Sequence, residues 1–152
     1  MNDIVRFVVV EAVKRIESES AVIYGAYAEA TDHYSARNML LSLRDASRER
    51  LEKVERLGRR QQCETLLAFP GGTVSAPSGS DSDVDHAFDA ETQYTDFLML
   101  ICRREGALAE LYQALSSGAS DAETAELFHA LARDCERRKT LARSRYDLET
   151  LA

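Results

Sequence analysis

Apolar residues recur every three or four positions along four segments of the chain, which is the spacing of one face of an α-helix. The pattern predicts helices at about 3–30, 35–67, 84–116 and 121–149. Valine and isoleucine near the start of the first segment favour a strand by propensity, but its length and its period outweigh that preference. Its apolar face consists of Val9, Val13, Ile16, Ile23, Tyr24 and Tyr27.

Residues that break helices are concentrated in one stretch. Both prolines of the chain, Pro70 and Pro77, and three of its seven glycines fall within ten positions. Residues 69–83 are therefore predicted to form an irregular connection. Only a few residues join the first predicted helix to the second, or the third to the fourth, so each pair is expected to form an antiparallel hairpin.

The length of the central connection predicts the topology. Its 15 residues reach at most about 50 Å when extended, and a helix of about 30 residues is roughly 45 Å long. The connection is therefore long enough to run the length of the bundle, which makes the second and third helices parallel. This is the one-crossover arrangement of a single four-helix domain. The alternative is a flexible linker between two hairpins that pair across chains.

The ends of two helices carry capping signals. Asp32 or Ser35 is placed to cap the second helix, and Ser120 with Glu123 forms a capping box for the fourth.

Composition excludes several classes of protein. The chain of 152 residues has a formal net charge of −7, which argues against nucleic acid as a partner. It contains no apolar run long enough for a membrane helix and no signal-peptide pattern, so we expect a cytoplasmic protein. Cys63, Cys102 and Cys135 are widely spaced and odd in number, which argues against a disulfide framework and a finger-type zinc site.

The two predicted hairpins match without a gap at an offset of 88 residues. Glu17 and Tyr24 align with Glu105 and Tyr112, and each pair is seven residues apart. The match extends to apolar positions, where Leu40, Leu43, Val9, Val10 and Val13 align with Phe128, Leu131, Phe97, Leu98 and Ile101. Together these matches indicate a duplicated hairpin, or two hairpins under the same packing constraint.

Glu17 and Glu105 each lie in the middle of an apolar helix face, four residues after an apolar residue and seven before the tyrosine. A carboxylate buried there costs several kcal/mol unless it is paired or bound to a metal. Both are therefore candidates for a functional site. The alternative is that each lies at the boundary of the face and reaches outward to solvent.

With these residues in place, the chain resembles the rubrerythrin-like branch of the ferritin-like superfamily. The resemblance covers nearly the whole chain and rests on the stretches IESESAVIYGAYAEA, LLSLRDASRERLEKVERL, REGALAELYQAL and ELFHALARDCERRKTLARSRYD. In that family, glutamates of the first and third helices and a Glu-x-x-His motif of the second and fourth hold two irons. The resemblance implies that Glu17 and Glu105 are equivalent to metal ligands, and that Tyr24 and Tyr112 line the site.

Four of the six ligand positions differ from the family. Ser47 and Arg50 stand where the second helix would carry Glu and His, and Cys135 and Arg138 stand there in the fourth. Arginine stays protonated and offers no lone pair to a metal. The resemblance therefore implies a diiron site that is largely lost, and we expect no resident metal or cofactor.

Two arginines and two glutamates at these positions sum to a formal charge of −2 + 2 = 0. We therefore predict that Arg50 and Arg138 replace the irons as counter-charges for Glu17 and Glu105, and the spacing leaves open which arginine pairs with which glutamate. Cys135 is expected to be a small buried residue. The neighbouring acids are expected to face away from the site; they are Asp45, Glu49, Asp134 and Glu136.

Three functions are compatible with this reasoning. The favoured one is a non-catalytic structural or interaction module that forms a homodimer and binds a protein partner. The second is an iron-binding oxidoreductase for peroxide reduction or ferrous iron oxidation, with Glu17 and Glu105 as ligands and the neighbouring acids recruited. The third is an unrelated four-helix module that carries a small ligand. The absence of any C-x-x-C pair argues against the rubredoxin-like tail of full rubrerythrins.

Overall fold

The computed structural model describes residues 3–60 and 94–151, with side chains from Val9 to Gly58 and from Tyr94 to Leu151. These residues form the helices α1 (Asp3–Ala30), α2 (Tyr34–Arg60), α4 (Tyr94–Gly118) and α5 (Ala122–Leu151). The prediction of an all-helical chain is confirmed over this part. The predicted crossover at 69–83, the end of the second predicted helix at 61–67 and the start of the third at 84–93 lie outside the described residues.

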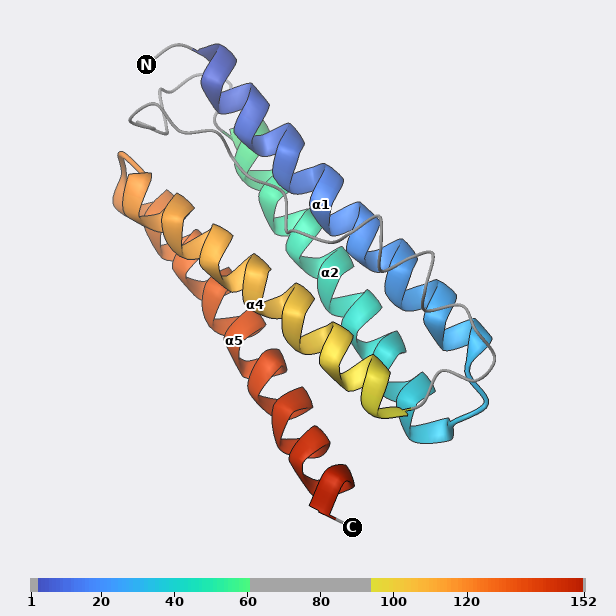
Figure 1. Cartoon of the computed structure of the whole chain (residues 1–152). Helices are drawn as coiled ribbons and strands as arrows, with labels where there is room; N and C mark the ends of the chain where they lie inside the picture. The colour runs from blue at the N-terminus through green and yellow to red at the C-terminus, as the bar shows by residue number, and fades with distance from the viewer. Residues whose placement is uncertain (1–2, 61–93, 152) are drawn as a thin grey trace.

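The four helices form two antiparallel hairpins that lie side by side (Figure 1). Helices α1 and α2 make one hairpin, and α4 and α5 make the other. Helices α2 and α4 run in the same direction, as the length of the central connection predicted. No helix of the described residues is long and apolar enough to cross a membrane.

The helix caps differ from those predicted. At the start of α2, the Nδ1 atom of His33 accepts a hydrogen bond from the backbone N–H of Ala36 at 3.2 Å. At the start of α5, Asp121 Oδ1 accepts one from the backbone N–H of Thr124 at 2.7 Å, in the manner of an N-cap. Each cap is therefore one residue away from a predicted one, because several polar residues in each turn could serve and local geometry selects among them.

Two apolar clusters fill the bundle, one toward each end. The first contains Val13 and Ile16 of α1 together with Leu108 and Tyr112 of α4. The second contains Tyr24 and Tyr27 of α1, Leu40 of α2, and residues from the first half of α4 such as Phe97, Leu98 and Ile101. Burial of these side chains, at about 1.5–3 kcal/mol each, is the main force that holds the hairpins together.

The 88-residue offset appears in the structure as an exchange between the clusters. Val9 and Val13 belong to the first cluster, whereas their matches Phe97 and Ile101 belong to the second. Conversely, Leu40 and Leu43 belong to the second cluster, and their matches Phe128 and Leu131 belong to the first. This is the exchange expected if a pseudo-twofold axis relates the hairpins, and it puts the middle of the bundle between the two clusters.

Candidate functional site: a buried guanidinium shared by two carboxylates

A layer of buried polar side chains lies between the two apolar clusters. Glu17 of α1, Ser47 and Arg50 of α2, and Glu105 of α4 are each at most 1% exposed. The structure thus brings both predicted carboxylates and one predicted arginine into the core of the bundle. Each element presents its residue inward because the residue lies on the same helical stripe as apolar neighbours four positions away.

Arg50 is the centre of this layer. Its Nε donates a hydrogen bond to Glu17 Oε1 at 2.8 Å, and its Nη2 lies 3.4 Å from Glu17 Oε2. The same Nη2 lies 3.2 Å and 3.3 Å from the two carboxylate oxygens of Glu105. Nη2 also reaches Ser47 Oγ at 3.2 Å, one turn earlier on α2. One guanidinium therefore binds both carboxylates and joins the two hairpins through its side chain.

The two glutamates have unequal surroundings. Glu17 accepts two hydrogen bonds from Arg50 and a third from the Tyr112 hydroxyl at 2.5 Å. The matching tyrosine near Glu105 is Tyr24, whose buried hydroxyl has no hydrogen-bond partner among the described residues. The internal repeat predicts the same surroundings for both glutamates. The structure differs because the single guanidinium of Arg50 directs its Nε and Nη2 to Glu17 and only its Nη2 to Glu105.

The charges of the layer shift the ionisation of its members. Burial alone would lower the pKa of Arg50, but Glu105 and Glu17 hold that pKa well above its ordinary value. Arg50 is therefore permanently charged. Burial raises the pKa of Glu105 to about 7, and Glu17 adds to this rise while Arg50 opposes it. Glu105 therefore changes protonation near neutral pH.

Arg138 was predicted to pair with one of the glutamates, but its ion pair is with Asp134; its charge acts on Glu105 only from a distance, where it helps to lower the pKa of that carboxyl. The Arg138 side chain is 21% exposed, and its Nε binds Asp134 Oδ2 at 3.1 Å, one turn earlier on α5. At the matching position of α2, one turn before Arg50, the residue is Ala46. Arg50 therefore has no acidic partner at that position and extends to the core, whereas Arg138 is held at the edge by Asp134.

Asp134 also corrects an expectation, because it faces the site instead of pointing away. Its Oδ2 accepts a hydrogen bond from Arg50 Nη1 at 3.0 Å, and its Oδ1 accepts one from Arg137 at 2.8 Å. Burial would raise the pKa of Asp134, but the positive charges of Arg138 and Arg50 and the hydrogen bonds that they donate lower it. The other three neighbouring acids, Asp45, Glu49 and Glu136, are exposed, as predicted.

Arg104 is the buried arginine that sequence reasoning missed. It is 3% exposed, and its Nη2 donates a hydrogen bond to Ser20 Oγ of α1 at 2.9 Å. Its Nε has no hydrogen-bond partner among the described residues. Its burial could have been predicted, because Arg104 lies four residues after Leu100 and four before Leu108, on the apolar face of α4. Arg50 and Arg104 are therefore the two buried arginines of the described residues, and of these Arg50 contacts the glutamates.

Cys135 is fully buried beside this layer. Burial, with a further contribution from Glu105, raises the pKa of its thiol far above the ordinary value. The thiol therefore stays protonated and is a weak nucleophile.

The arrangement does not fit a centre with two irons. Such a centre needs several anionic or neutral donors directed at the metals, whereas here the cationic side chain of Arg50 binds both central carboxylates. Within the part of the chain that the structure describes, no group of three or more His, Cys, Asp or Glu side chains is placed to hold a metal ion. What the site can do chemically is hold two buried carboxylates with an internal cation.

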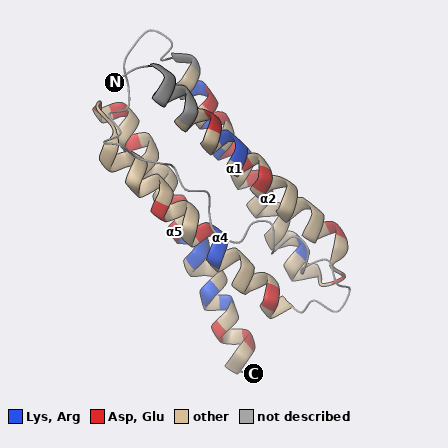
Figure 2. Cartoon of the chain, turned by 45° about the horizontal axis from the view of Figure 1, so that its top comes forward, with Lys and Arg blue, Asp and Glu red and all other residues tan. Residues whose placement is uncertain are grey.

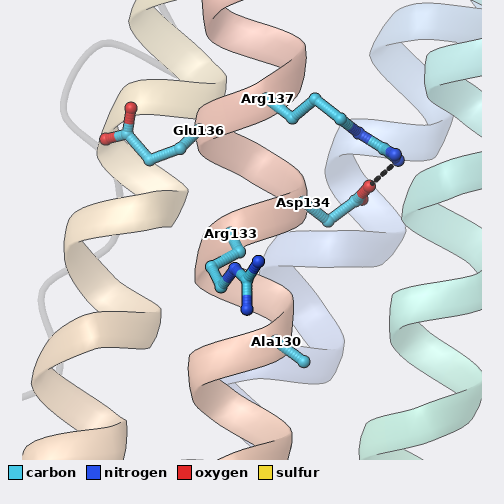
Figure 3. A pocket seen from close by; sticks show the side chains of 5 residues that line it. All are labelled: Ala130, Arg133, Asp134, Glu136 and Arg137. Carbon is cyan, nitrogen blue, oxygen red and sulfur yellow. Dashed lines mark hydrogen bonds and ion pairs between the residues drawn. The ribbon is translucent and has the colours of Figure 1, made fainter.

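A surface pocket of about 560 Å³ adjoins the site on α5. Figure 3 shows Asp134 and Arg137 on one side of the helix and Glu136 on the opposite side. The polar groups do not converge on a common point, so the pocket has no evident ligand chemistry. Its lining residues are Ala130, Arg133, Asp134, Glu136 and Arg137.

No protein-family model matches this chain, and searches of curated proteins and of solved structures find no significant match.

Proposed function

We propose that this chain is a ferritin-like, rubrerythrin-type helical bundle in which an internal arginine has taken the place of the metal centre, and that it acts as a non-catalytic structural or interaction module. The observation that carries the proposal is the position of Arg50, which donates hydrogen bonds to both Glu17 and Glu105. These are the two residues that the resemblance makes equivalent to metal ligands.

The electrostatics support this proposal. A metal ion and a guanidinium are alternative counter-charges for the same pair of buried carboxylates, since either one offsets part of their desolvation. With Arg50 bound to both glutamates, an incoming cation must displace a side chain that cannot lose its charge. Ser47 and Cys135, at two other ligand positions, supply no carboxylate that would favour the exchange.

The first test is the metal content of the full chain after purification without chelators, followed by titration with iron(II) and measurement of oxygen uptake. We expect less than one tightly held metal ion per chain and no oxygen uptake above that of free iron. Two tightly bound irons per chain with oxygen uptake would refute the proposal and establish the alternative, an iron-binding oxidoreductase with an altered site.

A second test restores the family's ligand set with four substitutions: Ser47→Glu, Arg50→His, Cys135→Glu and Arg138→His. We expect this variant to bind iron(II). The matched control carries only Cys135→Glu and Arg138→His; it should not bind iron, because Arg50 still holds both glutamates. Circular dichroism checks that both variants are helical. If the folded four-residue variant binds no iron, the proposed equivalence of positions is wrong.

A further inference from the structure

Arg104 is a buried cation that forms no ion pair with a carboxylate among the described residues. It is 3% exposed, and its Nη2 donates a hydrogen bond to the hydroxyl of Ser20, which is a neutral group, at 2.9 Å. Its Nε has no hydrogen-bond partner in the described part of the chain. Both buried glutamates bind Arg50 instead. Because a buried charge is unfavourable unless it is paired, the position of Arg104 favours a negatively charged ligand.

The hydroxyl of Tyr24 is a second buried polar group beside this guanidinium. Tyr24 is fully buried, and its hydroxyl has no hydrogen-bond partner among the described residues. Ser20 and Tyr24 are four residues apart on α1, and a long helical side chain leans over the preceding turn, so the Tyr24 ring extends toward Ser20 and thus toward Arg104. Burial raises the pKa of the Tyr24 hydroxyl and Glu105 adds to this rise, whereas Arg104 opposes it. The hydroxyl therefore lies within reach of the charge of Arg104.

The internal repeat shows that this polar pair stands in place of an apolar contact. At the offset of 88 residues, each member of the group has a match: Ser20 matches Leu108, Tyr24 matches Tyr112 and Arg104 matches Ile16. Ile16 and Leu108 belong to the apolar cluster that also contains Tyr112. The hydroxyl of Tyr112 donates to Glu17 and so needs no further partner. In the other half of the bundle, the two matching positions hold a guanidinium and a hydroxyl that bind each other, beside the tyrosine whose hydroxyl has no described partner.

The chemistry of the three side chains selects an anion. An arginine N–H can only donate a hydrogen bond, a tyrosine hydroxyl can donate one, and the hydroxyl of Ser20 keeps a proton to donate while its oxygen accepts from Arg104. A ligand that accepts hydrogen bonds and carries one negative charge satisfies these donors and offsets the cation. The ligand is also small, since Ser20, Tyr24 and Arg104 are at most 3% exposed. A halide ion meets these requirements, whereas a phosphate is too large and too highly charged.

We propose that Arg104, Tyr24 and Ser20 form a binding site for one small monovalent anion of chloride size. The anion accepts hydrogen bonds from the Nε of Arg104 and from the hydroxyl of Tyr24. A water molecule accepts the same hydrogen bonds without offsetting the charge, and it is the competing outcome of the test. The site goes beyond the structural role proposed above, because it gives the bundle a ligand.

The chain offers a matched control for the charge of Arg104. Arg103 and Arg104 are the basic residues of α4, and they form the blue stretch in the middle of this helix in Figure 2. Arg103 is exposed, whereas Arg104 is buried. Solvent and salt screen the charge of Arg103, so replacing Arg103 removes the same charge without altering the buried site.

The first experiment compares urea unfolding of the full chain in sodium chloride and in sodium gluconate at equal ionic strength. With a dissociation constant of about 10 mM, chloride at about 0.1 M should raise the ratio of folded to unfolded chain about tenfold. Arg104→Met should abolish this chloride effect, Tyr24→Phe should weaken it, and Arg103→Met should leave it unchanged. Circular dichroism checks that the variants are helical, and Tyr24→Phe keeps the test informative if Arg104→Met does not fold.

The second experiment locates the ion. In crystals of the full chain grown with sodium bromide, we expect an anomalous scattering peak within hydrogen-bond distance of Arg104 Nε and of the Tyr24 hydroxyl. Crystals of Arg104→Met should lack this peak, and crystals of Arg103→Met should retain it.

Three results would overturn the inference. Density at this place without an anomalous signal would identify a water molecule. Equal stability in chloride and gluconate, or a chloride effect that Arg104→Met and Tyr24→Phe leave intact, would show that these side chains hold no anion. A bromide peak without any chloride effect on stability would identify an adventitious ion only. Iron loading is measured separately on the same samples, so failure of the anion site and failure of the proposed loss of the metal site are distinguishable.

Discussion

Replacing Arg50 by methionine should destabilise the protein far more than the same change at Arg138. Methionine keeps much of the length of the side chain but removes the charge, and it leaves Glu17 and Glu105 buried with their main counter-charge gone. Breaking a buried ion pair from one side costs about 3–5 kcal/mol. Arg138 is partly exposed, and among the described residues its ion pair is with Asp134, so Arg138→Met should cost about 1 kcal/mol or less.

The measurement is the free energy of unfolding in urea, followed by circular dichroism at pH 8, above the pKa of about 7 that Glu105 has in the unaltered chain. The difference between Arg50→Met and the unaltered chain should shrink as the pH falls toward 5, because the unpaired carboxyls then become protonated and neutral. Ser47→Ala serves as a further control, since it removes only one of the hydrogen bonds made by Nη2.

A triple variant separates charge from packing, and it keeps the test informative if Arg50→Met alone does not fold. Changing Glu17 and Glu105 to Gln together with Arg50→Met removes all three charges at once. Since replacing a whole buried charge network is often neutral or stabilising, the triple variant should be more stable than Arg50→Met. Equal, small losses for Arg50→Met and Arg138→Met would refute the reasoning, as would a triple variant as unstable as the single one.

Three further predictions concern the same layer. Tyr112→Phe removes a hydrogen bond to a buried carboxylate and should lower the free energy of unfolding in urea by about 1.5–3 kcal/mol. Tyr24→Phe removes a buried hydroxyl that has no hydrogen-bond partner among the described residues, so in halide-free buffer it should be neutral or stabilising. Equal losses for the two variants would contradict the asymmetry of the site. The pKa of Glu105 is raised on folding, so the stability gained from its protonated form is fully present below pH 4.5 and is lost as the pH rises through about 7. The free energy of unfolding should therefore fall by about 2 kcal/mol from pH 5.5 to 8.5. Glu105→Gln should abolish that part of the pH dependence. Cys135 should resist alkylation by iodoacetamide until the chain unfolds, as mass spectrometry of its peptide would show; rapid labelling of the native chain would contradict its burial.

Much of the fold could be predicted from local pattern. The first helix was predicted at 3–30 and observed at Asp3–Ala30, because a long apolar stripe of period 3.6 has few alternative structures. The hairpins and the parallel direction of α2 and α4 followed from the lengths of the connections. The caps at His33 and Asp121 could not be selected, because each turn holds several polar residues within reach of the same backbone N–H groups.

The candidate site was predicted only in part. The repeat and the helical stripe identified Glu17, Arg50 and Glu105 as neighbours on inward faces, and all three are buried. The same repeat predicted that Arg138 would behave like Arg50, and it does not. The difference arises from one position: Asp134 lies one turn before Arg138, and Ala46 lies one turn before Arg50.

By itself, the sequence determined four helices, their pairing into matched hairpins and the presence of two carboxylates in the middle of an apolar core, since these depend on periodicity and chain length. Only the tertiary structure decided that one guanidinium serves both carboxylates, and that Arg104 is the second buried arginine in place of Arg138. The physical reason is that a long side chain can reach partners on several helices. Which partner it binds depends on the distances between the helices, and the periodicity of the sequence does not specify those distances.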